Sequence, residues 1–148
     1  MLDSGGSAVD AVTTAVQVME DDPVFNAGYG AALNRDGVHE LDASLMDGAS
    51  GRAGAVAGAQ HIRNPVLAAR ALAAVSDPLL LIGPAADAWA AAHGLETVDN
   101  AHFTTPARQA ALHTVLERER QGTQASATEQ EKHGTVGAVA LDLSLIHI

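Results

Sequence analysis

A threonine that follows a glycine is the residue of this sequence with the clearest capacity for nucleophilic chemistry. Thr135 lies in the stretch HGTVGAVALD, residues 133–142, where small and β-branched apolar residues predict a buried strand. A hydroxyl at the head of such a strand can act as a nucleophile when a base lies close to it. A Gly-Thr pair is also an ordinary start of a strand, so the meaning of Gly134 and Thr135 depends on the residues upstream.

Carboxylates and histidines are the other groups that could do chemistry. Glu40 and Asp42 share one face of a predicted strand, and such a pair can serve in acid-base catalysis. Charges on one side of a hairpin are usually a solvated face, which is the interpretation we prefer. The 7 histidines are scattered singly, without HExxH or another metal-ligand spacing. GxGxxG, GxxxxGK[ST] and GxSxG do not occur either, which argues against phosphate loops and serine hydrolases of that type.

Composition restricts the class of protein and its partners. The chain has 148 residues, of which 47% are hydrophobic and 3% aromatic, as expected for one globular domain with an aliphatic core. Its 8 basic and 18 acidic residues give a net charge of −10, so nucleic acid and anionic membranes are poor partners. The absence of cysteine excludes disulfides, thiolate zinc sites and a cysteine nucleophile. No apolar run approaches the roughly 20 residues of a membrane span, and the cytoplasm is the expected compartment.

Hydrophobic periodicity predicts the elements that position these residues. A helix is expected from Ser7, which caps it, to about Asp21. Alternating residues predict a hairpin of strands at 37–47 and 52–59. The further elements are a helix at 64–75 capped by Asn64, a buried strand at 79–83, a helix at 85–93 and a helix from 105 or 106 to about 121. The hairpin is inconsistent with a wholly parallel sheet.

Three segments lack such periodicity. The loop VFNAGYGAALN, residues 24–34, places glycines beside Asn26, so its backbone can approach another group closely. Residues 122–132 are small and polar and predict a flexible linker just before Thr135, where mobility would suit a chain that is to be cut. The last six residues, 143–148, match the product of a transposase mosaic-end sequencing adapter read in one frame, and we interpret them as a read-end scar.

Four sequence blocks, in order, resemble the plant-type L-asparaginases and isoaspartyl peptidases of the N-terminal-nucleophile hydrolase superfamily. The blocks are DDPVFNAGYGAALNRDG, HELDASLMDG, GAVAGAQHIRNPVLAAR and HGTVGAVALD. The resemblance covers about residues 1–142. It implies an α/β (α+β) fold, the four-layer αββα sandwich of these hydrolases, incomplete in this chain and formed from a precursor that cleaves itself.

The same resemblance assigns roles to individual residues. The bond between Gly134 and Thr135 would be cut, so that residues 1–134 form the α-subunit and 135–142 the first strand of the β-subunit. The free amine of Thr135, with an ordinary pKa of roughly 7.7 to 8.0, would then serve as the base for its own hydroxyl. Thr135 would hydrolyse L-asparagine or an isoaspartyl dipeptide to L-aspartate. Asn26 would lie beside this nucleophile and have a positioning and polar-stabilising role. The implied partners are that small-molecule or dipeptide substrate, the chain's own β-subunit and a second copy in an (αβ)2 assembly.

By the resemblance, no cofactor is expected other than a structural sodium ion. Backbone carbonyls would hold it, and a hard cation with carbonyl ligands needs no particular side chains. The implied ligands are Met19, Glu20, Asp22, Phe25, Ala27 and Tyr29.

Departures from the family pattern leave alternatives open. The family's first strand, its HGGAG-like segment and the β-subunit beyond the nucleophile strand have no counterpart here, so we expect this chain alone neither to cleave itself nor to hydrolyse asparagine. A glycosylasparaginase of the same fold is one alternative, although that group typically has an HDTIG-like block where this chain has HGTVG. A non-catalytic acidic binding domain, with Thr135 merely structural, is the other.

Overall fold

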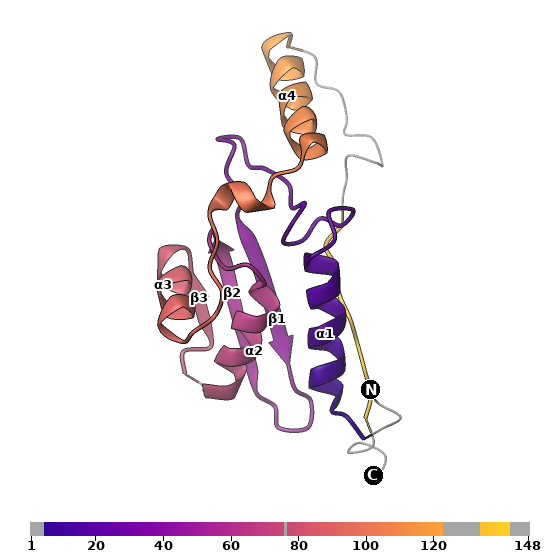
Figure 1. Cartoon of the computed structure of the whole chain (residues 1–148), viewed down its shortest axis with the longest axis vertical. Helices are drawn as coiled ribbons and strands as arrows, with labels where there is room; N and C mark the ends of the chain where they lie inside the picture. Colours follow the sequence, from indigo (N-terminus) through magenta and orange to yellow (C-terminus); the bar gives the residue numbers. More distant parts are fainter. Residues whose placement is uncertain (1–4, 76, 123–133, 143–148) are drawn as a thin grey trace.

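The computed structural model of the protein describes residues 5–75, 77–122 and 134–142. Its elements, shown in Figure 1, are α1 (Ala8–Glu20), β1 (Leu41–Met46), β2 (Ala53–Ala59), α2 (Pro65–Val75), β3 (Leu80–Ile82), α3 (Pro84–Ala92), the 3-10 helix η2 (Asn100–Phe103) and α4 (Pro106–Arg120). The helices and the first three strands predicted from periodicity are present with slightly shifted bounds, whereas η2 has no counterpart among the predictions. Within the described ranges, no helix is long and apolar enough to cross a membrane.

The sheet is small and mixed. β1 and β2 form the predicted antiparallel hairpin, and β3 pairs with β2 in parallel, so β2 is the central strand. Asp47 holds the turn between β1 and β2, where its carboxylate accepts hydrogen bonds from the Ala49 amide at 3.1 Å and the Ser50 hydroxyl at 2.5 Å. These bonds fix the geometry of the turn between the two strands.

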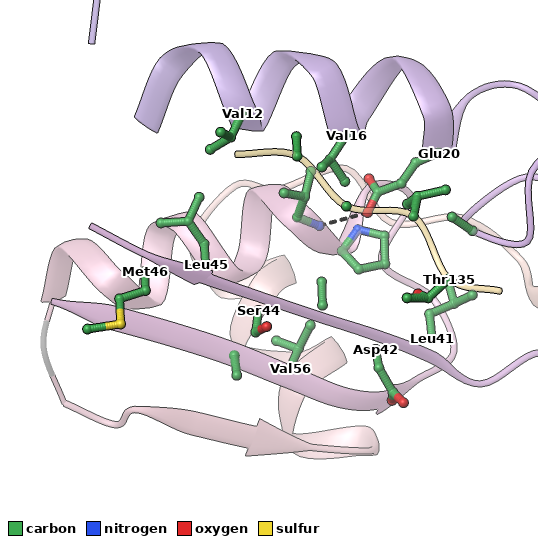
Figure 2. A pocket seen from close by; sticks show the side chains of 18 of the residues that line it. Val12, Val16, Glu20, Leu41, Asp42, Ser44, Leu45, Met46, Val56 and Thr135 are labelled. Carbon is green, nitrogen blue, oxygen red and sulfur yellow. Dashed lines mark hydrogen bonds between the residues drawn. The ribbon is translucent and has the colours of Figure 1, made fainter. Parts of the chain in front are cut away.

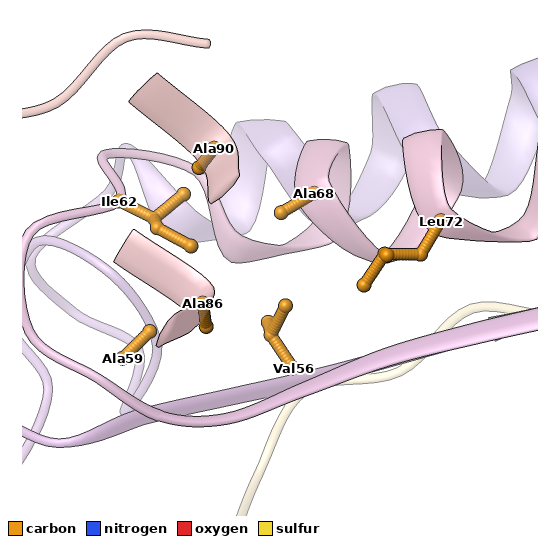
Figure 3. Close-up of a cluster of buried hydrophobic side chains, with 7 residues drawn as sticks. All are labelled: Val56, Ala59, Ile62, Ala68, Leu72, Ala86 and Ala90. Carbon is orange, nitrogen blue, oxygen red and sulfur yellow. The ribbon is translucent and has the colours of Figure 1, made fainter. Parts of the chain in front are cut away.

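The core lies between the sheet and the helices α2 and α3. Small residues dominate it, as the low aromatic content predicts. Figure 3 shows the cluster of Val56, Ala59, Ile62, Ala68, Leu72, Ala86 and Ala90. Gly54 of β2 allows α2 to lie directly on the strand, because a Cβ at this position would collide with the backbone of Ala69 and Ala73. Close approach of backbones thus replaces large side chains in filling the core.

Helix α1 lies beside α2 and covers the same side of β1. The hydroxyl of Ser7 accepts a hydrogen bond from the Asp10 amide at 3.0 Å, which confirms Ser7 as the predicted cap. The carboxylate of Asp10 also pairs with Arg70 of α2. The apolar side of α1 joins a second cluster that contains Val9, Val12, Ala43, Leu45, Ala69 and Ala73.

The strand β3 corrects one expectation. The apolar run at 79–83 predicts a buried strand, but Leu80 is 47% exposed and Ile82 is 62% exposed. Leu81 is the residue of β3 that packs against the core cluster, because α2 and α3 cover that face of the sheet, whereas Leu80 and Ile82 alternate onto the opposite face. Met46 of β1 is on that opposite face and is 70% exposed. The described part of the chain is therefore a mixed α/β unit of two layers, one of helices and one of strands.

Helix α4 projects away from the sheet in Figure 1, and none of its residues is buried. The hydroxyl of Thr105 caps it by accepting a hydrogen bond from the Arg108 amide at 3.2 Å. The guanidinium of Arg108 donates to the Gly30 carbonyl, and also to the Phe25 carbonyl at 3.3 Å. These two bonds tie the start of α4 to the loop that contains Asn26.

Residues 134–142 run beside α1 as an extended segment, drawn in yellow in Figure 1. The strand expected at 135–142 is not formed in this structure, because a strand requires a partner for its backbone ladder and the neighbour of this segment is a helix. All of the predicted linker 122–132 except its first residue, and the whole of 143–148, lie outside the described residues. The division into subunits at residue 134 stays a prediction.

Candidate active site

A cavity of about 860 Å³ lies between α1, β1, the loop around Asn26 and the extended segment that begins at Gly134. Figure 2 shows Val12 and Val16 of α1 on one side of it and Leu45 of β1 on the other. Its walls are mostly aliphatic, with a few polar groups, an arrangement typical of small-molecule sites. The polar side chains on its lining include Glu20, Asn26, Glu40, Asp42, Ser44 and Thr135.

The two residues to which the sequence analysis assigns chemistry are both on the lining of this cavity. Thr135 and Asn26 line the same cavity, although they come from opposite ends of the chain. Gly134 and Thr135 are both exposed, so the peptide bond between them is open to solvent. The Asn26 Oδ1 accepts a hydrogen bond from the Ala32 amide at 2.7 Å, which fixes the side chain within its loop. The amide group of an asparagine also carries two N–H donors, the kind of group that stabilises developing negative charge.

The two carboxylates of the predicted strand have separate structural roles. Glu40 accepts a hydrogen bond from the Asn34 side chain at 3.1 Å. Asp42 accepts one from the Gly58 amide at 2.7 Å, next to a shift in the register of β1 against β2. These contacts agree with our preference against an acid-base pair.

Glu20 is a residue of this site that sequence reasoning did not single out. It ends α1, lines the cavity and is 3% exposed. Its Oε1 accepts a hydrogen bond from the Val66 amide at 3.0 Å. Burial raises the pKa of Glu20 to about 7, although the Val66 amide and Asn64 act in the opposite direction. No local signal identifies such a residue, because an acidic residue at the end of a helix is ordinarily solvated.

The same contact corrects the predicted cap of α2. Asn64 has the right residue type and position for a cap, but its side-chain amide donates to Asp21 at 3.3 Å. The orphan amide of Val66 in the first turn of α2 is instead satisfied by Glu20. A carboxylate at the N-terminus of a helix also interacts favourably with the helix dipole, which explains why it replaces the local candidate.

The predicted cation ligands lie on the last residues of α1 and on the loop that follows and folds back on that helix. The Tyr29 amide donates to the Glu20 carbonyl at 2.7 Å, and the Phe25 amide donates to the Asp22 carbonyl at 3.2 Å. Gly28 has a φ of 47°, and a Cβ at this position would collide with the Glu20 carbonyl. Only glycine allows so tight a return of the chain.

This loop can be tested for its fit to a sodium ion. Each carbonyl oxygen has a second lone pair, so the hydrogen bonds to Glu20 and Asp22 leave capacity for a cation. The remaining ligands, Met19, Ala27 and Tyr29, offer carbonyls of the same kind. Arg108 opposes a cation at Phe25, because its guanidinium donates to that carbonyl at 3.3 Å. Carbonyl oxygens are hard, uncharged donors, so this donor set fits a hard ion better than a transition metal. No cluster of three or more His, Cys, Asp or Glu suited to a metal occurs in the described part of the chain.

His39 packs beneath the wall of the cavity and is a second residue that the sequence analysis did not single out. It is fully buried, with its Nε2 2.9 Å from the Thr104 hydroxyl and its ring edge-to-face with Phe103. Asn100 brackets its backbone, since the Asn100 side chain accepts from the His39 amide at 3.0 Å and donates to the His39 carbonyl at 2.9 Å. These contacts attach η2 to the start of β1 and hold the cavity wall in place.

The mixed α/β fold of the described residues agrees with the coarse fold class that the sequence blocks led us to expect. A family model described as asparaginase matches residues 1–146, and the chain belongs to this family.

Individual proteins of known name are similar to this chain over most of its length. The chain is 48% identical over 149 aligned residues to the isoaspartyl peptidase of Escherichia coli (strain K12), which covers 97% of this chain and 46% of that protein. It is 43% identical over 143 residues to the isoaspartyl peptidase/L-asparaginase of Homo sapiens, covering 96% of this chain and 45% of the human protein. A putative isoaspartyl peptidase/L-asparaginase of Dictyostelium discoideum is 42% identical over 108 residues, with 73% and 31% covered. The chain spans about half the length of the curated relatives it matches.

Proposed function

We propose that the whole protein is a self-cleaving amidohydrolase that uses Thr135 to convert L-asparagine, isoaspartyl peptides or both to L-aspartate. The observation that carries this proposal is the placement of an exposed Thr135 and of Asn26 on one cavity. The names of the relatives support the substrate class, because they describe isoaspartyl peptidases and asparaginases.

Maturation begins at the exposed bond between Gly134 and Thr135. The Thr135 hydroxyl attacks the Gly134 carbonyl carbon, the C–N bond breaks and an ester replaces the amide. Water then hydrolyses the ester, which leaves a carboxylate on Gly134 and a free α-amine on Thr135. That amine can accept a proton near neutral pH, whereas an isolated threonine hydroxyl is too weak a nucleophile to attack an amide.

The mature residue then acts on the substrate. The Thr135 amine takes the proton of its own hydroxyl, and the oxygen attacks the side-chain carbonyl of asparagine or of the β-aspartyl unit. Ammonia or the rest of the peptide leaves with that proton, and water releases L-aspartate from the resulting ester. Asn26 contributes a polar contact that positions the substrate and stabilises charge as it develops.

The proposal includes assembly in the cytoplasm with a β-subunit. Leu80, Ile82 and Met46 place exposed apolar side chains on one face of the sheet, and a second sheet packed there would complete the four-layer αββα sandwich of N-terminal-nucleophile hydrolases. Two such units would form the (αβ)2 assembly.

A sodium ion on the carbonyls of the loop from Met19 to Tyr29 is a further part of this proposal. Bound there, it would stiffen the loop that presents Asn26. Thermal unfolding of the chain in sodium chloride should then occur at a higher temperature than in potassium or choline chloride of equal ionic strength. Identical midpoints in the three salts would contradict the sodium site.

Substitution of Thr135 tests the central proposal. In the whole protein, Thr135→Ala should abolish both cleavage after Gly134 and release of ammonia from asparagine, while Thr135→Ser should retain part of both. Thr114→Ala, at an exposed position of α4, is the matched control and should leave both unchanged. Mass spectrometry of the cleaved chains and assays with asparagine, an isoaspartyl dipeptide and a glycosylated asparagine provide the measurements. Undiminished cleavage and turnover by Thr135→Ala would refute the proposal, and activity on glycosylated asparagine alone would favour a glycosylasparaginase.

A further inference from the structure

Asp142 makes a long-range contact that the proposed chemistry does not use. Its Oδ2 accepts a hydrogen bond from the backbone amide of Ala8 at 2.6 Å. Ala8 is the first residue of α1, so this amide has no acceptor within the helix. Ser7 caps a different amide, that of Asp10, and Asp142 therefore complements the local cap instead of duplicating it.

The hydrogen bond from the Ala8 amide to Asp142 belongs to a strong class of hydrogen bond. It joins the carboxyl group of Asp142 to an N–H group at the N-terminus of a helix, where the dipole of α1 favours negative charge. Asp10 already provides negative charge in the first turn of this helix, but it is engaged with Ser7 and Arg70. Asp142 thus attaches the extended segment to this end of α1.

The position of this contact determines where Thr135 lies. The extended segment runs antiparallel to α1, with Asp142 beside the start of the helix and Thr135 on the same cavity as Glu20, the last residue of the helix. Seven extended residues span about 23 Å, and α1, with 13 residues, is about 20 Å long. A segment attached at Ala8 thus reaches the far end of α1 with Thr135.

The exposure of the segment alternates along its length. Residues 136, 138, 140 and 142 are partly buried, whereas 135, 137, 139 and 141 are exposed, and Val139 is fully so. An extended chain has a side-chain period of two, so a slip by one residue would exchange the two sets. Such a slip would change the direction of the Thr135 hydroxyl relative to the cavity.

We propose that Asp142 is a positioning residue that fixes the register of the extended segment against α1 and thereby presents Thr135 to the cavity. The catalytic consequence rests on the proposed function, whereas the register itself does not. The absence of cysteine from the sequence makes the register measurable by thiol labelling.

The first experiment places single cysteines on the two faces of the segment in the 148-residue chain. In the otherwise unchanged chain, Val139→Cys should react with a soluble disulfide reagent about tenfold faster than Ala140→Cys. Adding Asp142→Ala should bring the two rates to within about twofold of each other, because the segment loses its register. Asp142→Asn keeps an oxygen acceptor and should restore part of the difference. Asp10→Ala removes a carboxylate from the same helix turn without touching the segment, and should preserve the difference.

The second experiment measures the reaction in the whole protein. Asp142→Ala should slow cleavage after Gly134 and lower kcat on the order of 100-fold with little change in KM, because the nucleophile is misplaced. Asp142→Asn should recover part of this loss. An unchanged difference between the two cysteines in the presence of Asp142→Ala would overturn the inference. Equalised labelling with normal cleavage and turnover would overturn the positioning role in the reaction, whereas failure of the Thr135→Ala test would overturn the proposed function and leave the labelling result standing.

Discussion

The Oε1 atom of Glu20 accepts a hydrogen bond from the Val66 amide at 3.0 Å, and this bond joins the last residue of α1 to the first turn of α2. We expect Glu20→Ala to lower the free energy of unfolding by about 1 to 3 kcal/mol, because the buried Val66 N–H would be left without an acceptor. Glu20→Gln keeps an oxygen at this position and should cost less. Urea denaturation of the 148-residue chain at fixed pH provides the measurement.

The control for this prediction is another glutamate in an ordinary ion pair. Glu96 bonds to Arg63 at 3.0 Å, and its side chain is 61% exposed. Glu96→Ala should therefore change the free energy of unfolding by less than about 1 kcal/mol. A loss in Glu20→Ala no larger than in Glu96→Ala would show that the bond to Val66 contributes little.

The second prediction concerns Gly54 and the packing of α2 on the sheet. Its Cβ position is occupied by the backbone of Ala69 and Ala73, and backbone cannot move aside as a flexible side chain can. Gly54→Ala should lower the free energy of unfolding by about 1 to 3 kcal/mol or more through overpacking. Gly48 has open space at its Cβ position, so Gly48→Ala is the matched control. Calorimetry that finds equal midpoints for both variants would contradict this account of the core.

The helices and strands of this fold could be predicted because each is determined by residues within it. Ser7 caps α1 through the amide of Asp10, three positions away, and alternation within 37–47 marks β1 without reference to other segments. The exposure of β3 could not be predicted, because burial depends on whether another segment covers the strand. The apolar run at 79–83 predicts a strand, but it does not indicate whether another layer of the protein covers that strand.

The residues of the candidate site were predicted from family resemblance and not from local sequence patterns. Thr135 and Asn26 came from the resemblance of sequence blocks to a family, and the structure places both on one cavity, while their catalytic roles stay predictions. The bonds from Glu20 to Val66 and from Asp142 to Ala8 could not be predicted, because they join residues far apart in sequence. The cap of α2 shows the difficulty, since Asn64 satisfies every local rule and still yields to Glu20.

Arg108 leads to a third prediction, about the attachment of α4. Its guanidinium donates to the carbonyls of Gly30 and Phe25, whereas α4 has no buried residue, and its ion pair from Glu119 to Arg35 at 2.9 Å is solvent-exposed. We expect Arg108→Ala to increase amide hydrogen exchange throughout α4, together with a loss of about 1 to 3 kcal/mol in the free energy of unfolding. Arg108→Lys should be only partly effective, because an ammonium lacks the planar fork that reaches two carbonyls.

The control for Arg108 lies on the same helix. The side chain of Arg120 is 73% exposed and its distance to Glu117 is 3.7 Å, so Arg120→Ala should leave hydrogen exchange in the first turns of α4 unchanged. Equal exchange in the Arg108→Ala and Arg120→Ala chains would mean that α4 is held by other contacts.

His39 leads to the last prediction, a dependence of stability on pH. Burial lowers the pKa of His39 below its ordinary value, and Arg108 adds to this effect, while the carbonyls of Ala32 and Ala31 oppose it. The unfolded chain takes up a proton at this residue near pH 6.5, whereas the folded chain keeps the ring neutral to a lower pH. The contribution of His39 to the free energy of unfolding should therefore decrease as the pH falls below about 6.5, by at most about 1.4 kcal/mol per pH unit. Glu20, whose pKa burial raises to about 7, acts in the opposite direction over part of this range, so the His39 contribution is read from the difference between variants.

The contribution of His39 can be isolated by comparing two variants across that range. His39→Gln removes the titrating ring, so the part of the pH dependence due to this residue should vanish, even though the lost contacts with Thr104 and Phe103 lower stability at every pH. His113→Gln removes an exposed histidine of α4 and should keep the slope of the unchanged chain. Urea denaturation at closely spaced pH values from 5 to 8 separates the slope from the overall loss. If the slope survives in His39→Gln, the buried ring is not the group that the unfolded state protonates first, and the pH response must come from other residues.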